Sequence, residues 1–301
     1  MSNIGATFSH HQITNLGLSV EESLTKVLAL ELAYLRLACH WSEVESSVGE
    51  YDFTQIERLL SMCDERGQAV VLTLGVKAPR WPEFYWPEWL SSREASAPDV
   101  QSAIGSFVSA CVTSLRQHAC IKYWQVENEP LDPSGPDHTV LPMKLLSMEV
   151  DLVRSLDPRP IILTAWGNEL VRRKTLPQLA PLADVIGIDL YDRQYSTTIL
   201  GKHIYRGPED SPQDLRRALE ATGKKYWIME LQAEPWEKDE ASYLSDEPAS
   251  MSPQRLHDHL TRARLLGAEC VMLWGIEYAL FRAHKEDQRY MAIIERLHDD
   301  A

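Results

Sequence analysis

The fold is decided by a unit that appears in Thr54-Gln-Ile-Glu-Arg-Leu-Leu-Ser-Met-Cys-Asp-Glu-Arg-Gly67 and continues in Ala69-Val-Val-Leu-Thr-Leu74. Thr54 and Glu57 have the spacing of a capping box, and apolar residues then recur on one helical face. Gly67 is expected to end this helix because glycine tolerates a left-handed backbone. The apolar run that follows is typical of a strand buried on both faces.

The same unit recurs along the chain as a helix, a glycine and a short apolar strand. Two further copies lie at 211–229 and 252–273. Filling the gaps predicts eight strands, near residues 4–8, 33–38, 69–75, 121–127, 160–166, 184–190, 225–231 and 269–275. Strands that alternate with helices form parallel sheets, and eight such units favour an α/β fold that is a single (β/α)8 TIM barrel over 1–301. A doubly wound open sheet is the alternative.

The expected loops differ in length at the two ends of the strands. Connections from helix to strand are short, whereas those from strand to helix are long near 76–97, 128–139, 191–210 and 231–251. In a (β/α)8 barrel these long loops gather at the carboxyl ends of the strands, where barrel enzymes keep their active sites. The asymmetry therefore predicts an enzyme.

Composition excludes several classes of partner and compartment. The formal charge at pH 7 is −14, which argues against binding a nucleic acid or an anionic membrane surface. No apolar run approaches the ~18 residues of a membrane span.

The five cysteines include no C-x-x-C pair, so we expect buried thiols. Met1–Val20 lacks the features of a secretory signal, which predicts a cytoplasmic protein; a secreted protein with its leader removed is the alternative. The oligomeric state stays open.

Two glutamates follow apolar strands at the expected active face. Glu129 comes after the fourth strand and Glu230 after the seventh. One such carboxylate would be explained by an ion pair at the barrel mouth, but two on these strands indicate chemistry. Cleavage of a glycosidic bond requires one protonated carboxyl group and one ionised carboxylate. Spacing alone does not choose between Glu129 and Glu127 as the first of them.

The residues around these glutamates carry a family resemblance. Asn128-Glu129-Pro130 resembles the fourth-strand motif of clan A glycoside hydrolases, the (β/α)8 group that includes families five, ten, thirty-nine and forty-two. The resemblance implies that Glu129 is the acid/base and Glu230 the nucleophile of a retaining β-glycosidase. The resemblance extends over most of the chain, from the second expected strand to the eighth. One departure is Lys77, which stands where some of these families have a sugar-contacting histidine or asparagine.

Four further residues match supporting positions of the clan. Arg36 would brace the nucleophile, Tyr191 would donate a hydrogen bond to it, and Trp274 would form the floor of the reacting sugar's subsite. Asn128 would donate to the sugar 2-hydroxyl. Arg36 could instead form a structural ion pair at the sheet end, and Tyr191 could pack a loop at the rim.

Aromatic residues are abundant in the expected loops. Trp81 belongs to the long loop after the third strand, Trp41 to a stretch similar to the W-x-x-I-E-P pattern of several clan families, and Trp236 to the loop after the seventh strand. Sugars present apolar C–H faces, so these residues are candidates for stacking on substrate, although each could equally pack its own loop. His40 is a candidate for hydrogen bonding to a sugar hydroxyl.

Other functions stay open at this point. A metal-dependent barrel hydrolase or lyase would need converging ligands, for which the candidates are His10, His11, His40 and Asp189, but an H-x-H motif is absent. A transglycosylase or a sugar-binding pseudoenzyme could use the same barrel. We predict a hydrolase without metal or cofactor that acts on an oligosaccharide, a polysaccharide, or an aryl or alkyl glycoside.

Overall fold

The computed structural model describes residues 3–136 and 138–298, and within them eight parallel strands form a closed barrel with the order β1-β12-β11-β8-β7-β6-β5-β2. The predicted barrel is therefore confirmed, and each strand lies within one residue of its expected bounds. The strands are β1 (Asn3–Thr7), β2 (Tyr34–Ala38), β5 (Val70–Leu74), β6 (Ile121–Val126), β7 (Ile161–Trp166), β8 (Val185–Leu190), β11 (Lys225–Gln232) and β12 (Cys270–Trp274). All five residues of β5 are buried, as its continuous apolar run predicts.

Helices connect these strands, and several long loops contain short helices of their own. The α-helices are α1 (His10–Asn15), α2 (Val20–Leu28), α3 (Trp41–Val44), α4 (Thr54–Arg66), α5 (Pro98–Leu115), α6 (Met143–Leu156), α7 (Leu170–Arg173), α8 (Leu176–Leu179), α9 (Pro212–Glu220), α10 (Glu240–Tyr243), α11 (Pro253–Arg264), α12 (Ile276–His284) and α13 (Arg289–Glu295). Short 3-10 helices cover Gly167–Glu169 and Arg296–His298. In the described part of the chain, no helix has both the length and the apolar character that a membrane crossing requires.

The helix ends follow their predicted caps, with one correction. The Ser211 and Ser252 hydroxyls accept hydrogen bonds from backbone N–H groups at the starts of α9 and α11. Gly67 has a left-handed backbone with φ of 65°. The capping box at Thr54 is wrong, because Thr54 is already helical and its N–H donates to Asp52 Oδ1 at 2.9 Å.

The chain divides into two compact units. The first unit comprises the chain up to Leu32, Trp166–Lys174 and the chain from Ile188 on. It contains β1, the second half of β8, β11 and β12, with Gly5 paired to Met272 between β1 and β12. The second unit comprises Ala33–Ala165 and Thr175–Gly187 and contains β2, β5, β6, most of β7 and the first half of β8. All five cysteines are buried and free, as predicted.

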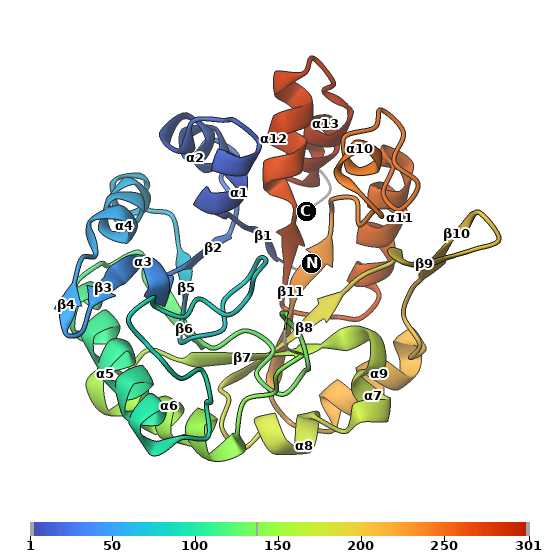
Figure 1. Cartoon of the computed structure of the whole chain (residues 1–301). Helices are drawn as coiled ribbons and strands as arrows, with labels where there is room; N and C mark the ends of the chain where they lie inside the picture. Colours follow the sequence, from blue (N-terminus) through green and yellow to red (C-terminus); the bar gives the residue numbers. More distant parts are fainter. Residues whose placement is uncertain (1–2, 137, 299–301) are drawn as a thin grey trace. The chain divides into compact units, whose positions relative to one another are not determined.

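The long strand-to-helix connections contain two small hairpins that the sequence did not predict. β3 (Glu45–Ser47) pairs with β4 (Glu50–Tyr51) in the second unit. In the first unit β9 (Gln194–Ile199) pairs with β10 (Lys202–Arg206), inside the segment that was expected to be a loop. Figure 1 shows the β9–β10 hairpin projecting from the strand ends of its unit.

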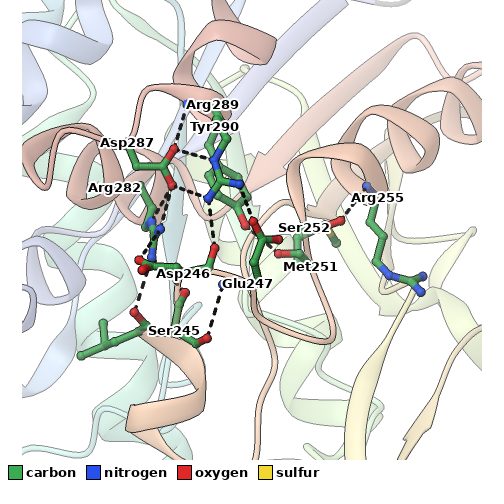
Figure 2. Close-up of polar contacts among 11 residues, drawn as sticks. Ser245, Asp246, Glu247, Met251, Ser252, Arg255, Arg282, Asp287, Arg289 and Tyr290 are labelled. Carbon is green, nitrogen blue, oxygen red and sulfur yellow. Dashed lines mark hydrogen bonds and ion pairs between the residues drawn. The ribbon is translucent and has the colours of Figure 1, made fainter.

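A cluster of charged side chains joins the loop before α11 to the C-terminal helices (Figure 2). Asp287 accepts hydrogen bonds from Arg282 Nη2 at 2.7 Å and from Arg289 Nε at 2.9 Å. The same guanidinium groups donate to loop carbonyls, Arg282 to Ser245 at 2.9 Å and Arg289 to Asp246 at 3.0 Å. Asp287 therefore orients both arginines so that they donate hydrogen bonds to the carbonyl groups of the loop.

Replacing Asp287 with Asn is expected to destabilise the protein in a pH-dependent way. The hydrogen bonds from Arg289 and Arg282 hold the pKa of Asp287 well below its usual range. Such a carboxylate contributes stability that is present above its unfolded pKa of ~3.9 and is lost as the pH falls towards its folded pKa. We expect the free energy of unfolding to fall by about 2 kcal/mol at pH 7.

Urea unfolding followed by circular dichroism at pH 7 and near pH 2.5 would measure this effect. The difference between wild type and Asp287→Asn should shrink at the lower pH. The matched control is Asp246→Asn, whose carboxylate also contacts Arg282 but is 95% exposed, so its loss should stay below about 1 kcal/mol. An undiminished difference at low pH would contradict the expected linkage.

Candidate active site

Glu230 lies near the end of β11, at an irregularity of the strand. The pairing of β11 with β12 shifts register between Ile228 and Leu231, and such shifts re-aim side chains next to active sites. Glu230 is buried, and its Oε2 accepts a hydrogen bond from the Tyr191 phenol at 2.5 Å. The hydrogen bond predicted between these two residues is present.

Tyr191 is itself held on several sides. Its backbone N–H donates to Asn168 Oδ1 at 3.0 Å, and Asn168 Nδ2 donates back to the Tyr191 carbonyl at 2.8 Å. The phenol ring stacks on Trp166 with centroids 5.1 Å apart and meets Trp236 edge-on at 5.2 Å. These contacts fix the direction in which the phenol donates to Glu230. Neither Asn168 nor Trp166 was predicted from the sequence, although Trp166 ends a predicted strand and could have been found by that position.

The other aromatic candidates of the first unit differ in exposure. Trp236 is 43% exposed, so part of its ring remains open to a ligand beside Tyr191. Trp274 ends β12 and is largely buried. Its carbonyl accepts a hydrogen bond from Ala233 at 2.7 Å, which ties the strand end to the loop after β11. Trp236 and Trp274 can thus present aromatic surface on the same unit as Glu230.

Glu129 lies in the second unit, just beyond the end of β6. Its backbone N–H donates to Thr164 Oγ1 at 2.8 Å, and its carbonyl accepts from Lys77 Nζ at 2.6 Å. The side chain is 7% exposed. Lys77, which departs from the clan pattern, thus uses its ammonium group to hold the turn that carries Glu129.

The structure distinguishes Glu129 from Glu127. The Glu127 side chain is fully buried, and its carboxylate accepts hydrogen bonds from the backbone N–H groups of Val76 at 2.9 Å and Lys77 at 2.5 Å. Because both Glu127 oxygens are engaged at the end of β5, this carboxylate is unavailable to a ligand. Glu129 is therefore the better candidate for proton transfer, a choice that residue spacing left open.

Arg36 and Asn128 form a buried polar group with Gln125. Arg36 is fully buried and donates from Nε to Gln125 Oε1 at 2.8 Å and from Nη2 to Asn128 Oδ1 at 2.5 Å. Gln125 Nε2 also donates to the Glu127 carbonyl at 2.9 Å. With its oxygen held in this way, Asn128 can use its Nδ2 to donate to a ligand. Gln125 was not predicted from the sequence.

The remaining predicted residues of the second unit divide into three kinds. His40 is buried, stacks on Tyr85 at 3.9 Å and places Nδ1 3.2 Å from Glu43. Trp81 is 72% exposed and can contact a ligand. The prediction for Trp41 is wrong: the side chain is fully buried, and its ring stacks on Phe107, so it packs the core.

A cluster of possible metal ligands lies elsewhere in the second unit. Ligand atoms of Asp64, His118 and Cys120 lie within 4.8 Å of one another. Asp64 Oδ1 accepts the Cys120 N–H at 2.6 Å, and Oδ2 contacts His118 Nδ1 at 2.7 Å. Burial raises the pKa of the Cys120 thiol, which disfavours the thiolate that a metal requires. These residues are best explained as a hydrogen-bonded link between α4 and the start of β6.

Comparison with protein families adds a sequence match. The family model described as glycosyl hydrolase family 10 matches residues 10–145. This range includes Arg36, Asn128 and Glu129 but ends before Glu230. No curated protein matches the chain in sequence.

Solved structures of glycosidases have the same fold. The exo-β-1,4-mannosidase Op5Man5 from Opitutaceae bacterium strain TAV5 is 18% identical with a TM-score of 0.66, over 91% of this chain and 52% of that one. Xylanase 10B from Thermotoga petrophila RKU-1 is 16% identical with a TM-score of 0.60, over 91% and 82%. GH5_18 from Streptomyces cattleya is 15% identical with a TM-score of 0.63, over 91% and 70%. This chain thus spans about half the length of the mannosidase and is similar to clan A glycoside hydrolases.

Proposed function

We propose that this protein is a retaining glycoside hydrolase that cleaves β-linked glycosides by double displacement, with Glu230 as nucleophile and Glu129 as acid/base. The observation that carries the proposal is the placement of two largely buried carboxyl groups, one just after β6 and one near the end of β11. The carboxyl ends of parallel barrel strands lie at one end of the barrel. Retaining glycosidases place their two carboxyl groups about 5–5.5 Å apart.

In the first step Glu230 attacks the anomeric carbon. The bond between that carbon and the leaving oxygen breaks, and Glu129 transfers its proton to this oxygen, so a neutral alcohol departs. The hydrogen bond from Tyr191 orients the Glu230 carboxylate for attack. Asn128 supports the transition state by donating to the sugar 2-hydroxyl, a contact that strengthens as positive charge develops on the ring.

In the second step water releases the sugar. Glu129, now a carboxylate, takes a proton from the water, and the resulting hydroxide equivalent attacks the anomeric carbon. The ester bond to Glu230 breaks and the nucleophile is regenerated as a carboxylate. Two inversions at one carbon give net retention, and the carboxyl groups perform both steps without a cofactor.

Aromatic residues supply the proposed sugar-binding surface. Trp236 offers an exposed ring beside Tyr191, and Trp81 offers one on the loop after β5. Rings of this kind stack against the apolar C–H faces of a sugar. The substrate class is therefore a β-linked oligosaccharide or polysaccharide, or an aryl or alkyl β-glycoside.

A substrate panel with product stereochemistry tests the proposal. We expect turnover of at least one member of a set of 4-nitrophenyl β-glycosides that includes mannoside, galactoside, glucoside, fucoside and xylobioside. Proton NMR during early turnover should show the β-anomer of the released sugar first, because double displacement retains configuration. The α-anomer appearing first would overturn the proposed mechanism. No turnover of any of these glycosides, or of xylan, mannan and glucan, would overturn the function.

A further inference from the structure

Two carboxyl groups meet in the interior of the second unit, one from the end of β6 and one from α6. Glu127 and Glu149 are both fully buried. Among the described residues no N–H or O–H group donates a hydrogen bond to either oxygen of Glu149, and the Glu127 carboxyl is the charged group that acts on it. Burial and the negative charge of Glu127 raise the pKa of Glu149 well above its usual value, which favours the protonated form of Glu149, the form that can donate a hydrogen bond to the Glu127 carboxylate.

The Glu127 carboxylate is held by the segment that follows β5. Val76 and Lys77 donate their backbone N–H groups to the two oxygens of Glu127. Gly75 leaves room for the carboxyl group, since a Cβ at this position would lie 2.4 Å from it. Glu127 therefore joins the end of β6 to the segment that follows β5.

That segment in turn holds the backbone on both sides of Glu129. The Lys77 carbonyl accepts the Asn128 N–H at 2.7 Å, and Lys77 Nζ donates to the Glu129 carbonyl at 2.6 Å. Glu127 and Glu129 have φ values of 60° and 43°, in the left-handed region that residues other than glycine seldom adopt. Such a conformation persists only where the surroundings hold it. The contacts of Glu127 supply that restraint.

Glu149 lies on a face of α6 whose other residues are apolar and buried in the core. Leu145 and Val153, one turn to either side of it, are fully buried. A carboxyl group at such a position is costly unless it has a partner. Its partner here is Glu127, two residues from the proposed acid/base.

We propose that Glu127 is a positioning residue for proton transfer by Glu129, with Glu149 as the hydrogen-bond donor that keeps the Glu127 carboxylate in place. This inference rests on the proposed function, because it takes Glu129 as the acid/base. Glu127 touches no reacting atom and acts only through the backbone that carries Glu129.

The variant Glu127→Gln tests this role. A glutamine offers one acceptor oxygen, so its amide N–H group would face one of the two backbone N–H groups that Glu127 now accepts. We expect kcat/KM for a phenyl β-glycoside, whose leaving group needs a proton, to fall about 30-fold. For the 2,4-dinitrophenyl β-glycoside of the same sugar, which departs without protonation, the fall should stay below about 3-fold. The sugar is the best substrate of the panel described above.

The ratio of the two kcat/KM values is the decisive readout, because it does not depend on how much of the variant is folded. A purely structural role for Glu127 would lower both values by the same factor and would overturn the inference. Glu149→Gln is the matched control: its amide N–H can still donate to Glu127, so both values should remain within about 3-fold of wild type. Glu149→Leu removes the donor and should reproduce the loss specific to the phenyl glycoside. An unchanged ratio in Glu149→Leu would exclude Glu149 from the role.

The same two substrates separate this inference from the proposed function. If Glu129→Ala shows no loss specific to the phenyl glycoside, Glu129 is not the acid/base and the proposed function fails. If Glu129→Ala shows that loss and Glu127→Gln does not, only the positioning role fails.

Discussion

Replacement of Glu230 with Ala should lower kcat/KM for an aryl β-glycoside by about 10⁴-fold or more. In the proposed mechanism the Glu230 carboxylate forms the covalent intermediate, so the variant loses the first displacement altogether. The proposed acid/base Glu129 and the proposed sugar-binding residues remain. Substrate binding should therefore change less than turnover, and kcat should carry most of the loss.

Added azide gives a second test of Glu230→Ala, because it should restore turnover. The missing side chain leaves space for a small anion on the face of the sugar from which Glu230 attacks. Azide should restore turnover of the 2,4-dinitrophenyl β-glycoside, and the product should be the α-glycosyl azide because only one displacement has occurred. NMR of the isolated product identifies the anomer.

Glu234, just beyond the end of β11, offers a matched control. It is also a largely buried carboxylate, and it lies only four residues along the chain from Glu230. We expect Glu234→Gln to retain kcat/KM within about 10-fold of wild type. Retained activity in Glu230→Ala, with loss and azide rescue in a variant of Glu234, would assign the nucleophile to Glu234 instead.

Replacement of Glu129 with Ala should produce a loss that depends on the leaving group. Proton transfer by a positioned carboxyl group contributes about 10²–10⁴-fold to such reactions. We expect a fall of that size in kcat/KM for phenyl β-glycosides, because phenoxide leaves poorly without a proton. The 2,4-dinitrophenyl glycoside should show a fall of less than about 10-fold, since its leaving group is already stable as an anion.

The second half of the reaction gives an independent check on Glu129. Without a general base the glycosyl-enzyme is hydrolysed slowly, so kcat on the dinitrophenyl substrate should fall and azide should raise it. The product should here be the β-glycosyl azide, because both displacements occur. Asp132→Asn alters a carboxylate on the same turn and should leave both substrates within about 3-fold of wild type. Equal losses on the two aryl glycosides would rule out Glu129 as the acid.

The barrel could be predicted from local patterns because each of its strands has a strong one. The five residues of β5 are all apolar or β-branched and all buried, and the expected strand bounds were correct within one residue. The β9–β10 hairpin has no such signal. Most of its residues are exposed, so no apolar alternation distinguishes it from a loop. Leu200 at its turn is 98% exposed.

The start of α4 shows that a sequence pattern does not distinguish two N-terminal capping arrangements that differ by one residue. Thr54 and Glu57 have capping-box spacing, yet the N–H of Thr54 finds its acceptor in Asp52, two residues earlier. Both arrangements satisfy a backbone donor at a helix start, and they differ by one residue in register. Local spacing does not decide between them.

The sequence by itself determined the (β/α)8 architecture, because periodicity is a local property of the chain. From strand-end position it predicted Glu230 together with Glu129 or Glu127 as a carboxyl pair, and only the family resemblance favoured Glu129. Only the tertiary structure decided what each side chain touches. It showed that the Glu127 oxygens are engaged by the backbone just after β5, that Trp41 belongs to the core, and that Asn168 holds Tyr191 against Glu230. Such contacts join residues tens of positions apart, and hydrogen-bond direction and burial at those contacts exist only once the strands are assembled.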